Sequence, residues 1–231
     1  MLDNATIERL KAMKMNAFAA ELERQLEDSE SYSQLGFEER LGLLVDSEWN
    51  RRQNNKLNRY IEIARFSAMS ATMEGIEYIE DRHLDKAEML RFATCAYVDE
   101  GHHIILKGAS GNGKTYIACA LGNAACRKFK TVRYIRMPEL LDELCVAKAN
   151  GEFSKAIKSY KRVDLLIVDE GLIHKLTPQE SYIMLEIAEA RETRSMILCT
   201  QYHPEGWYER INPDPDNDSP ISEAIIDRII N

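Results

Sequence analysis

The amino-acid sequence predicts an α/β protein in which a parallel central sheet follows an all-helical N-terminal domain. Two observations lead to this fold class. The first 65 or so residues show helical spacing of apolar residues and no strand-like alternation, whereas apolar strands and helical segments alternate after residue 100. Because parallel strands need a crossover between them, such alternation indicates right-handed β-α-β units. The chain has 231 residues, enough for one well-buried α/β domain and a smaller appendage.

The N-terminal domain is expected to consist of two helices. A break at Ser29–Gly36 separates the first helix from a second one over about 37–65. Small residues and mixed polarity over 67–82 indicate a linker. The chain is therefore divided into a helical domain at 1–66, a linker at 67–82 and an α/β domain at 83–231. The apolar stripe of the first helix consists of Ile7, Leu10, Phe18, Leu22 and Leu26.

Four strands and the helices between them are expected in the α/β domain. Pro138 and Pro178 suit the first turn of a helix because the proline ring fixes φ. Thr177 and Glu180, on either side of Pro178, have the spacing of a capping box. The expected strands are 102–107, 131–136, 164–168 and 195–200. The expected helices are 114–129, 138–150, 152–161, 177–193 and a last helix from 219 onward.

A glycine-rich loop joins the first expected strand to the helix that follows it, and it matches the G-x-x-x-x-G-K-[ST] pattern. Glycines let the backbone curl so that successive N–H groups point at phosphate oxygens, and the positive end of the helix faces the same anion. Lys114 is expected to reach the β- and γ-phosphates of ATP, and the Thr115 hydroxyl to coordinate Mg²⁺. The candidate ATP-binding residues are Gly108, Ala109, Ser110, Gly111, Asn112, Gly113, Lys114 and Thr115.

Two carboxylates, Asp169 and Glu170, directly follow the third expected strand. We expect Asp169 to hold the hydration shell of Mg²⁺ and Glu170 to polarise the water that attacks the γ-phosphate, which favours hydrolysis over transfer to a substrate hydroxyl. Thr200 and Gln201 end the fourth strand, where ligands of parallel sheets bind. They either touch the γ-phosphate or the attacking water, or cap the next loop. The catalytic candidates are Lys114, Asp169, Glu170, Thr200 and Gln201, and the metal candidates are Thr115 and Asp169.

Several segments around these motifs follow one another in a distinctive order. They are Arg40–Trp49, Arg51–Phe66, Ile104–Thr115, Tyr134–Leu141, Asp164–Leu172, Leu185–Arg191, Cys199–Tyr202 with Trp207, and Ala224–Arg228. In this order the chain resembles the IstB-type transposition-helper ATPases, which are related to DnaC-type helicase loaders. The nucleotide motifs occur in many ATPases, whereas the flanking segments are more specific, and the resemblance covers essentially the whole chain.

This resemblance implies an AAA+ P-loop ATPase fold with a helical N-terminal domain. It also implies a DNA-stimulated ATPase that forms a homo-oligomer on duplex DNA with ATP and delivers target DNA to a partner transposase. Arg228 falls where the family places an arginine that senses nucleotide, often from the neighbouring subunit; the alternative is a solvated arginine on a terminal helix. The family continues past the Asp-Arg pair with a final strand and a basic tail. We therefore expect a C-terminally truncated chain whose sheet lacks one edge strand.

Basic residues cluster in two places that could contact DNA phosphates. Between 51 and 65 there are five basic residues and one acid, and Arg52, Lys56 and Arg59 share one helix face. The second cluster lies in the insertion between the second and third strands. Phosphate contacts position a protein without reading base sequence, so salt-sensitive binding with little specificity is expected; a solvated surface is the alternative. The DNA candidates are Arg51, Arg52, Lys56, Arg59, Lys148, Lys155 and Lys158.

Composition narrows the class of protein further. No apolar run is long enough to span a membrane, so no membrane partner is expected. The five cysteines are scattered and show no Cys-x-x-Cys spacing, which argues against a disulfide framework or a zinc site and favours the reducing cytoplasm. The net charge of −8 argues weakly against nucleic acid as a partner, although the clustering of basic residues matters more.

Three alternatives to a transposition helper stay open at this point. A helicase loader would bind a replicative helicase and prefer single strands, for which base-stacking aromatic residues are typical. A small-molecule P-loop kinase should carry a lid with arginines, and the Asp-Glu pair argues against it. A DNA-binding scaffold would use ATP only for assembly, and replacing Glu170 with glutamine would then change nothing.

Overall fold

The computed structural model describes residues 4–78, 84–212, 214 and 217–230. The chain folds as two compact units, at 1–59 and 60–231. The sequence-based division into 1–66, 67–82 and 83–231 stays a prediction. No helix within the described ranges is long and apolar enough to cross a membrane.

Three helical segments build the first unit: α1 (Asn4–Ala12), α2 (Asn16–Glu27) and the first part of α3 (Phe37–Ala64). The first expected helix is therefore two helices, and the chain between them includes Lys14 in the left-handed region at φ 61°. The expected break before residue 37 is confirmed. The small core of this unit contains Ile7, Leu10 and Ala19, with Met15, Phe18 and Leu22 packed against it.

A buried carboxylate, Glu48 of α3, joins α3 to the start of α2. Its Oε2 atom accepts hydrogen bonds from the backbone N–H groups of Ala17 and Phe18, at 3.0 and 3.4 Å. Its Oε1 atom accepts hydrogen bonds from the guanidinium groups of Arg51 and Arg52, at 2.6 and 2.8 Å. The bond from Arg51 is the main cause that lowers the pKa of Glu48 to about 2. Glu48 thus supplies an acceptor for N–H groups that the first turn of a helix leaves unpaired.

Acid is expected to weaken the first unit through Glu48. A carboxylate whose pKa is depressed in the folded chain stabilises the fold fully above its ordinary pKa of 4.5, and this contribution is lost as the pH falls toward about 2. Glu48→Gln should remove that part of the pH dependence and lower the free energy of unfolding at neutral pH by about 2 kcal/mol. Urea unfolding at several pH values measures both effects. Glu38→Gln, on an exposed position of the same helix, is the control, and equal losses in the two variants would contradict the assignment.

A four-stranded sheet forms the centre of the second unit, in the order β1-β4-β3-β2. All three pairings are parallel, so the expected parallel sheet is confirmed. The two central strands, β3 and β4, are buried almost throughout, which explains their nearly continuous apolar sequences. The expectation that an edge strand is missing stays a prediction. The strands are β1 (Ile104–Lys107), β2 (Val132–Arg136), β3 (Leu165–Gly171) and β4 (Ser195–Thr200).

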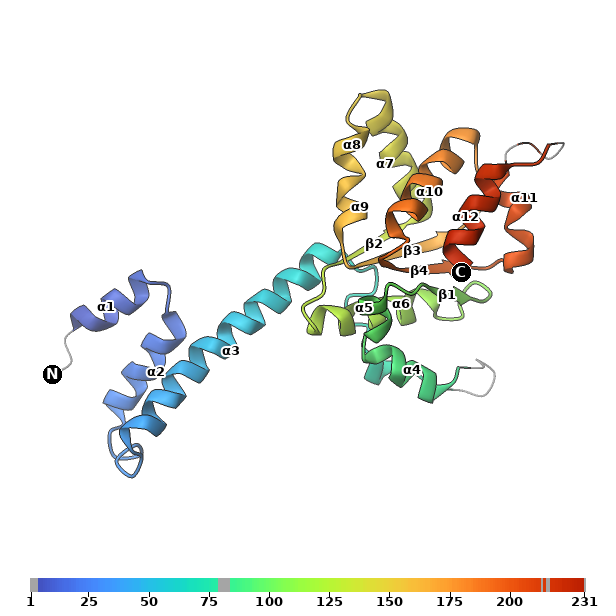
Figure 1. Cartoon of the computed structure of the whole chain (residues 1–231). Coiled ribbons are helices and arrows are strands. Elements are labelled where there is room, and N and C mark those ends of the chain that lie inside the picture. Colours follow the sequence, from blue (N-terminus) through green and yellow to red (C-terminus); the bar gives the residue numbers. More distant parts are fainter. Residues whose placement is uncertain (1–3, 79–83, 213, 215–216, 231) are drawn as a thin grey trace. The chain divides into compact units, whose positions relative to one another are not determined.

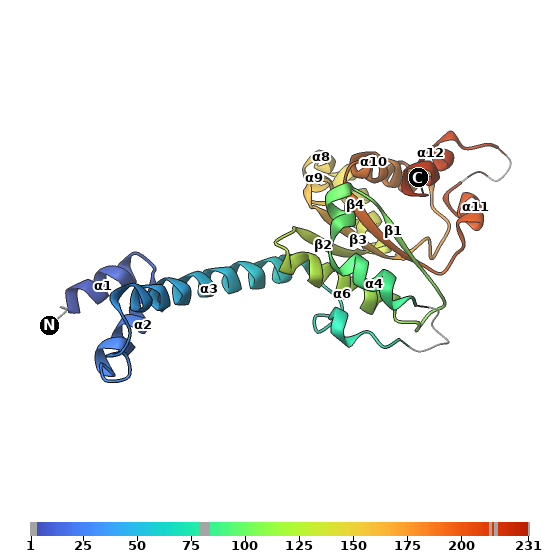
Figure 2. The same cartoon turned by 60° about the horizontal axis from the view of Figure 1, so that its bottom comes forward.

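Helices cover both faces of this sheet (Figures 1 and 2). One face carries α7 (Met137–Ala149), α10 (Pro178–Arg191) and α12 (Pro220–Ile230), and the other carries α4 (Lys86–Ala93), α5 (Ala96–Glu100) and α6 (Lys114–Arg127). Shorter helices, α8 (Phe153–Ala156), α9 (Lys158–Arg162) and α11 (Tyr208–Ile211), lie in the connections. The capping box that opens α10 is confirmed, because Thr177 and Glu180 exchange both of its hydrogen bonds. The sequence did not predict α4, α5 or α11, which are too short to show a clear period.

The segment that follows α3 packs against α6. The Nδ2 atom of Asn123 donates a hydrogen bond to the carbonyl of Ala71 at 3.0 Å, and both Phe66 and Ala71 are buried. Gly122 allows this close approach, because a Cβ atom there would lie 2.5 Å from the Phe66 ring. Residues 67–78 of the expected linker are thus part of the packed structure around the sheet, and residues 79–82 lie outside the described residues.

Candidate nucleotide-binding site

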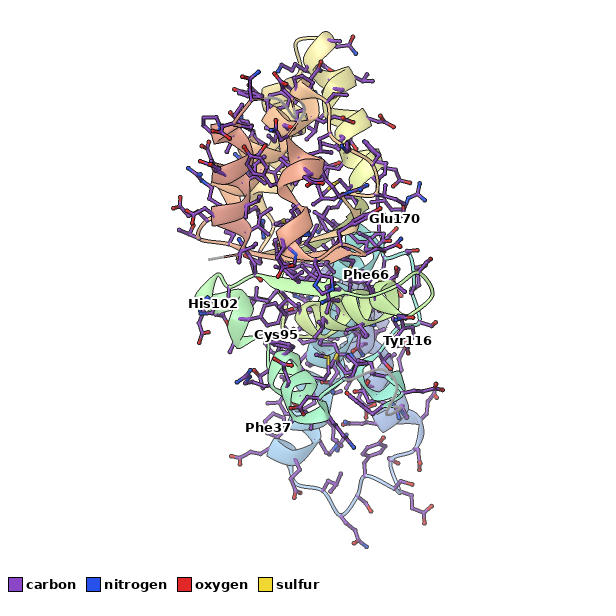
Figure 3. All side chains as sticks on the ribbon, turned by 90° about the vertical axis from the view of Figure 1, so that its right-hand side faces the viewer. Phe37, Phe66, Cys95, His102, Tyr116 and Glu170 are labelled. Carbon is purple, nitrogen blue, oxygen red and sulfur yellow. The ribbon has the colours of Figure 1, made fainter. Side chains whose placement is uncertain are left out.

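A cavity of about 450 Å³ lies at the carboxyl ends of the strands, between the glycine-rich loop, the end of β3 and the end of β4. This is where parallel sheets bind their ligands. Five of the eight predicted ATP-binding residues line it, whereas Gly108, Ala109 and Asn112 form the loop behind that wall. The other predicted residues in the lining are Asp169, Glu170, Thr200 and Gln201. Figure 3 labels two lining residues, Glu170 and Tyr116.

The loop conformation depends on two of its glycines. Gly111 and Gly113 have φ values of 83° and 77°, in the left-handed region where a side chain would be strained. The loop leads directly into α6, so the N-terminal end of a 14-residue helix faces the cavity. The Lys114 ammonium donates hydrogen bonds to the carbonyl oxygens of Gly108 and Ala109, both at 2.7 Å. Among the described residues no carboxylate pairs with this lysine, so its charge is available to an anion in the cavity.

The structure brings Thr115 and Asp169 together, 54 positions apart in the chain. The Thr115 hydroxyl donates a hydrogen bond to Oδ2 of Asp169 at 2.6 Å. Asp169 is 4% exposed, and its Oδ1 atom accepts a hydrogen bond from the backbone N–H of Glu170 at 2.8 Å. A hydroxyl and a carboxylate side by side at a phosphate-binding loop suit Mg²⁺, which takes one or two protein ligands and completes its shell with phosphates and water. The described residues contain no cluster of three or more His, Cys, Asp or Glu side chains that would enclose a metal by themselves.

Glu170 has an unusual backbone conformation at the end of β3. Its φ is 55°, and the pairing of β3 with β4 becomes irregular between Val168 and Gly171. Strained residues of this kind cluster at functional sites. The carboxylate lines the cavity, and its Oε1 atom lies 3.5 Å from Nη1 of Arg136, which also pairs with Glu139 at 2.9 Å. Sequence reasoning missed Arg136. Its place as the last residue of β2 is the signal that could have found it, because the register sets it opposite Asp169.

Thr200 and Gln201 differ in what their side chains can do. The Thr200 hydroxyl is buried; it donates to the carbonyl of Gly171 at 2.9 Å and accepts from the backbone N–H of Tyr202 at 3.2 Å. This geometry matches the alternative considered for the pair, in which a strand-end residue caps the next loop. Gln201 is exposed and lines the cavity, so its amide is the one that can reach a phosphate or a water there.

Arg228 lies apart from this cavity in its own chain. Its guanidinium donates to the carbonyl of Ala224 at 3.1 Å and to Glu189 at 3.4 Å. It lines a different cavity, of about 590 Å³, together with His102 and His103. A nucleotide-sensing role for Arg228 would therefore have to be exerted on a neighbouring subunit.

The predicted DNA-binding residues fall into three environments. Arg51 and Arg52 of the first unit are paired with Glu48. Lys148 lies over the ring of Tyr182, with 4.5 Å between Nζ and the ring centroid. The remaining residues, Lys56, Arg59, Lys155 and Lys158, are exposed on α3 and around α8 and α9.

Together the fold and this site define a class of protein. A parallel sheet with a phosphate loop after β1 and an Asp-Glu pair at the end of β3 is an AAA+ P-loop ATPase fold. The solved structure of a DnaC helicase loader superposes with a TM-score of 0.55 at 20% identity, over 69% of this chain and 92% of that chain. A DNA replication initiation factor gives a TM-score of 0.55 at 21% identity over 70% of this chain; the matched region spans about half of that protein, 47%.

The family is shown by the sequence comparisons. The family model of the IstB-like ATP binding proteins matches residues 7–231, and the chain belongs to this family. An insertion-sequence ATP-binding protein of Sinorhizobium fredii is 32% identical over 232 residues, which cover 100% of this chain and 91% of that protein. The ATP-binding protein of an insertion sequence of Pseudomonas fluorescens is 34% identical over 202 residues, 87% of each chain. The resemblance found in the sequence is thereby confirmed.

Proposed function

We propose that this chain is a DNA-dependent ATPase that assembles with ATP on duplex DNA and delivers target DNA to a partner transposase. The observation that carries the proposal is the bond of 2.6 Å between Thr115 and Asp169 inside a cavity that Glu170 also lines. The cavity thus contains both the residues needed to hold a metal–nucleotide complex and a carboxylate, Glu170, that can activate water. Membership of the family supports the link to transposition, because the relatives are ATP-binding proteins of insertion sequences.

In this proposal the predicted residues of the cavity divide the work of binding and hydrolysing ATP. The loop N–H groups and Lys114 bind the phosphates; Thr115 and Asp169 would hold Mg²⁺, which would supply positive charge to the bound phosphates. Glu170 polarises the attacking water, and Gln201 orients that water or the γ-phosphate. Arg228 acts on the nucleotide of a neighbouring subunit, where a guanidinium stabilises charge on the transferred phosphoryl group.

The first test is light scattering of the protein with duplex DNA, with and without ATP, at low and moderate salt. Large particles that need both ATP and duplex are the expected result. ATP turnover is measured in the same samples and should rise with duplex. Particles that form without ATP, or a protein that stays small and whose turnover ignores DNA, would contradict the proposal.

Contacts with DNA are proposed for two exposed lysines, one in α8 and one at the start of α9. Changing Lys155 and Lys158 to alanine should weaken duplex binding uniformly across sequences and reduce the slope of log affinity against log salt by about 2. The matched control changes Lys128 and Lys175 to alanine, two exposed lysines elsewhere in the second unit. Both double variants then have the same net charge. Fluorescence anisotropy over a salt series measures the slopes. Equal slopes in the two double variants would remove these lysines from the DNA interface.

A helicase loader is the second candidate function, favoured by the fold likeness to the DnaC helicase loader over most of that chain. It predicts preference for single strands and a stable complex with a replicative helicase. The same anisotropy measurement with single-stranded DNA separates the two functions. Tighter binding of single strands than of duplex at equal salt would favour the loader over the transposition helper.

A further inference from the structure

Tyr134 of β2 contacts the proposed metal carboxylate directly. Its hydroxyl donates a hydrogen bond to Oδ2 of Asp169 at 2.9 Å, the same oxygen that accepts from Thr115. The strand register explains the contact: Tyr134 pairs with Ile167, and Asp169 lies two residues further along β3 on the same face. A diagonal neighbour of this kind is within reach of a tyrosine side chain. Tyr134 begins one of the segments that carry the family resemblance, but sequence reasoning assigned it no role in the site.

A second side chain, Ser67, acts on the Tyr134 hydroxyl. The interaction with Ser67 acts to lower the pKa of Tyr134. Burial and the charge of Asp169 nevertheless raise the pKa of Tyr134 well above its ordinary value. The Tyr134 O–H is the hydrogen-bond donor to the carboxylate, which offers only acceptor oxygens. Ser67, Tyr134 and Asp169 thus form one chain of side-chain interactions, in which Tyr134 donates to Asp169.

We infer that Tyr134 is a positioning residue for Mg²⁺–nucleotide binding, which holds Oδ2 of Asp169 beside Thr115 through its hydroxyl. The inference deepens the proposed function and rests on it, because it assumes that Thr115 and Asp169 hold the metal. Without the phenol, Oδ2 of Asp169 keeps the Thr115 hydroxyl and Oδ1 keeps the backbone N–H of Glu170, but the carboxylate loses its contact with β2 and can turn away from the metal position. Losing the Tyr134 hydroxyl also leaves more negative charge on Oδ2 of Asp169, and this effect by itself would strengthen metal binding. The loss of orientation is expected to dominate, since residues that orient metal ligands typically matter about 10- to 100-fold for metal affinity.

The chain offers a matched control for Tyr134. Tyr97 of α5 is also buried, with 6% of its surface exposed against 7% for Tyr134. Its hydroxyl is buried and has no hydrogen-bond partner among the described residues. Tyr134→Phe and Tyr97→Phe therefore delete the same atom from two buried rings, and only the first deletion removes a bond to the metal carboxylate.

The test titrates a fluorescent ATP analogue onto the wild type and both variants, first in EDTA and then over a range of Mg²⁺ concentrations. In EDTA the three proteins should bind the analogue equally. The Mg²⁺ concentration that gives half of the metal-dependent gain in affinity should rise about tenfold in Tyr134→Phe alone. Equal behaviour of the two variants, or weaker binding by Tyr134→Phe in EDTA, would overturn the inference. A wild type whose binding ignores Mg²⁺ would instead overturn the metal site of the proposed function.

Ser67→Ala provides an independent test that leaves the Tyr134 ring in place. Because Ser67 acts through the Tyr134 hydroxyl, its removal should raise the required Mg²⁺ concentration in the wild type and change nothing further in Tyr134→Phe. Additive effects in the double variant would show that Ser67 does not act through Tyr134 and would break the proposed chain. If Tyr134→Phe yields no folded protein, Ser67→Ala alone must show the Mg²⁺-specific shift, and its absence counts against the inference.

Discussion

Replacing Glu170 with glutamine is expected to slow ATP hydrolysis about 100-fold or more while ATP and duplex DNA still bind. Glutamine keeps the size and the polar end of the side chain, and it removes the carboxylate that can polarise the attacking water. The phosphate-binding loop, Lys114 and the Thr115–Asp169 pair are untouched by this change. Binding and chemistry should therefore separate cleanly in this variant.

Phosphate release in single-turnover and steady-state assays measures this effect, with nucleotide affinity measured in parallel. Glu139→Gln is the matched control, since Glu139 pairs with the same arginine, Arg136, but does not line the cavity. A scaffold that uses ATP only for assembly predicts a different result. If Glu170→Gln and Glu139→Gln hydrolysed ATP at the same rate, Glu170 would not be the activating carboxylate.

Replacing Arg191 with methionine is expected to lower the free energy of unfolding by about 4 kcal/mol. Arg191 of α10 is fully buried, and its guanidinium is surrounded by backbone carbonyl oxygens. It donates hydrogen bonds to the backbone carbonyls of Tyr160 at 3.2 Å, Val163 at 2.6 Å and Asp164 at 3.0 Å, and also to that of Ser195. Methionine fills much of the volume but removes the guanidinium donors from these buried or partly buried carbonyls, of which Val163 keeps a long bond of 3.5 Å from Arg194; an unpaired buried acceptor costs about 1–3 kcal/mol.

Arg194→Met is the control for this effect. Arg194 lies three residues further on, has 43% of its side chain exposed, and donates to the carbonyl of Arg162 at 2.9 Å. Its loss should change the free energy of unfolding by less than about 1 kcal/mol. Urea unfolding followed by circular dichroism measures both variants. If the two variants unfolded at similar urea concentrations, the hydrogen bonds of the buried Arg191 guanidinium would not be an important source of stability.

Much of the second unit could be predicted because its signals are local in the sequence. The loop from Gly108 to Thr115 carries its own conformation in its glycines, and Thr177 and Glu180 specify the start of α10 within four residues. β3 and β4 lie at the centre of a parallel sheet and are mostly apolar, so their positions could be found from their apolar runs. The short helices α4, α5 and α11 show no such period, and the sequence did not predict them.

The first unit shows where local signals are insufficient. A stripe of apolar residues predicted one helix where the chain makes two, because the spacing before and after the break is helical on both sides. The basic residues after Glu48 suggested a surface for phosphates. In the folded unit Arg51 and Arg52 are paired with that carboxylate, which also caps α2. A count of charges between 51 and 65 starts too late to include it.

By itself the sequence determined the class of site: a phosphate-binding loop, two carboxylates at a strand end and the family that contains them. Only the tertiary structure decided which side chains act on those groups. Tyr134 reaches Asp169, Arg136 reaches Glu170, and Arg191 reaches the carbonyls of Asp164, just before β3, and of Ser195 in β4. These partners are more than 25 positions apart in most cases. A shift of one residue in the register of β2 would turn Tyr134 and Arg136 to the other face of the sheet. Residue types carry the chemistry of a site, whereas register and packing decide which residues meet.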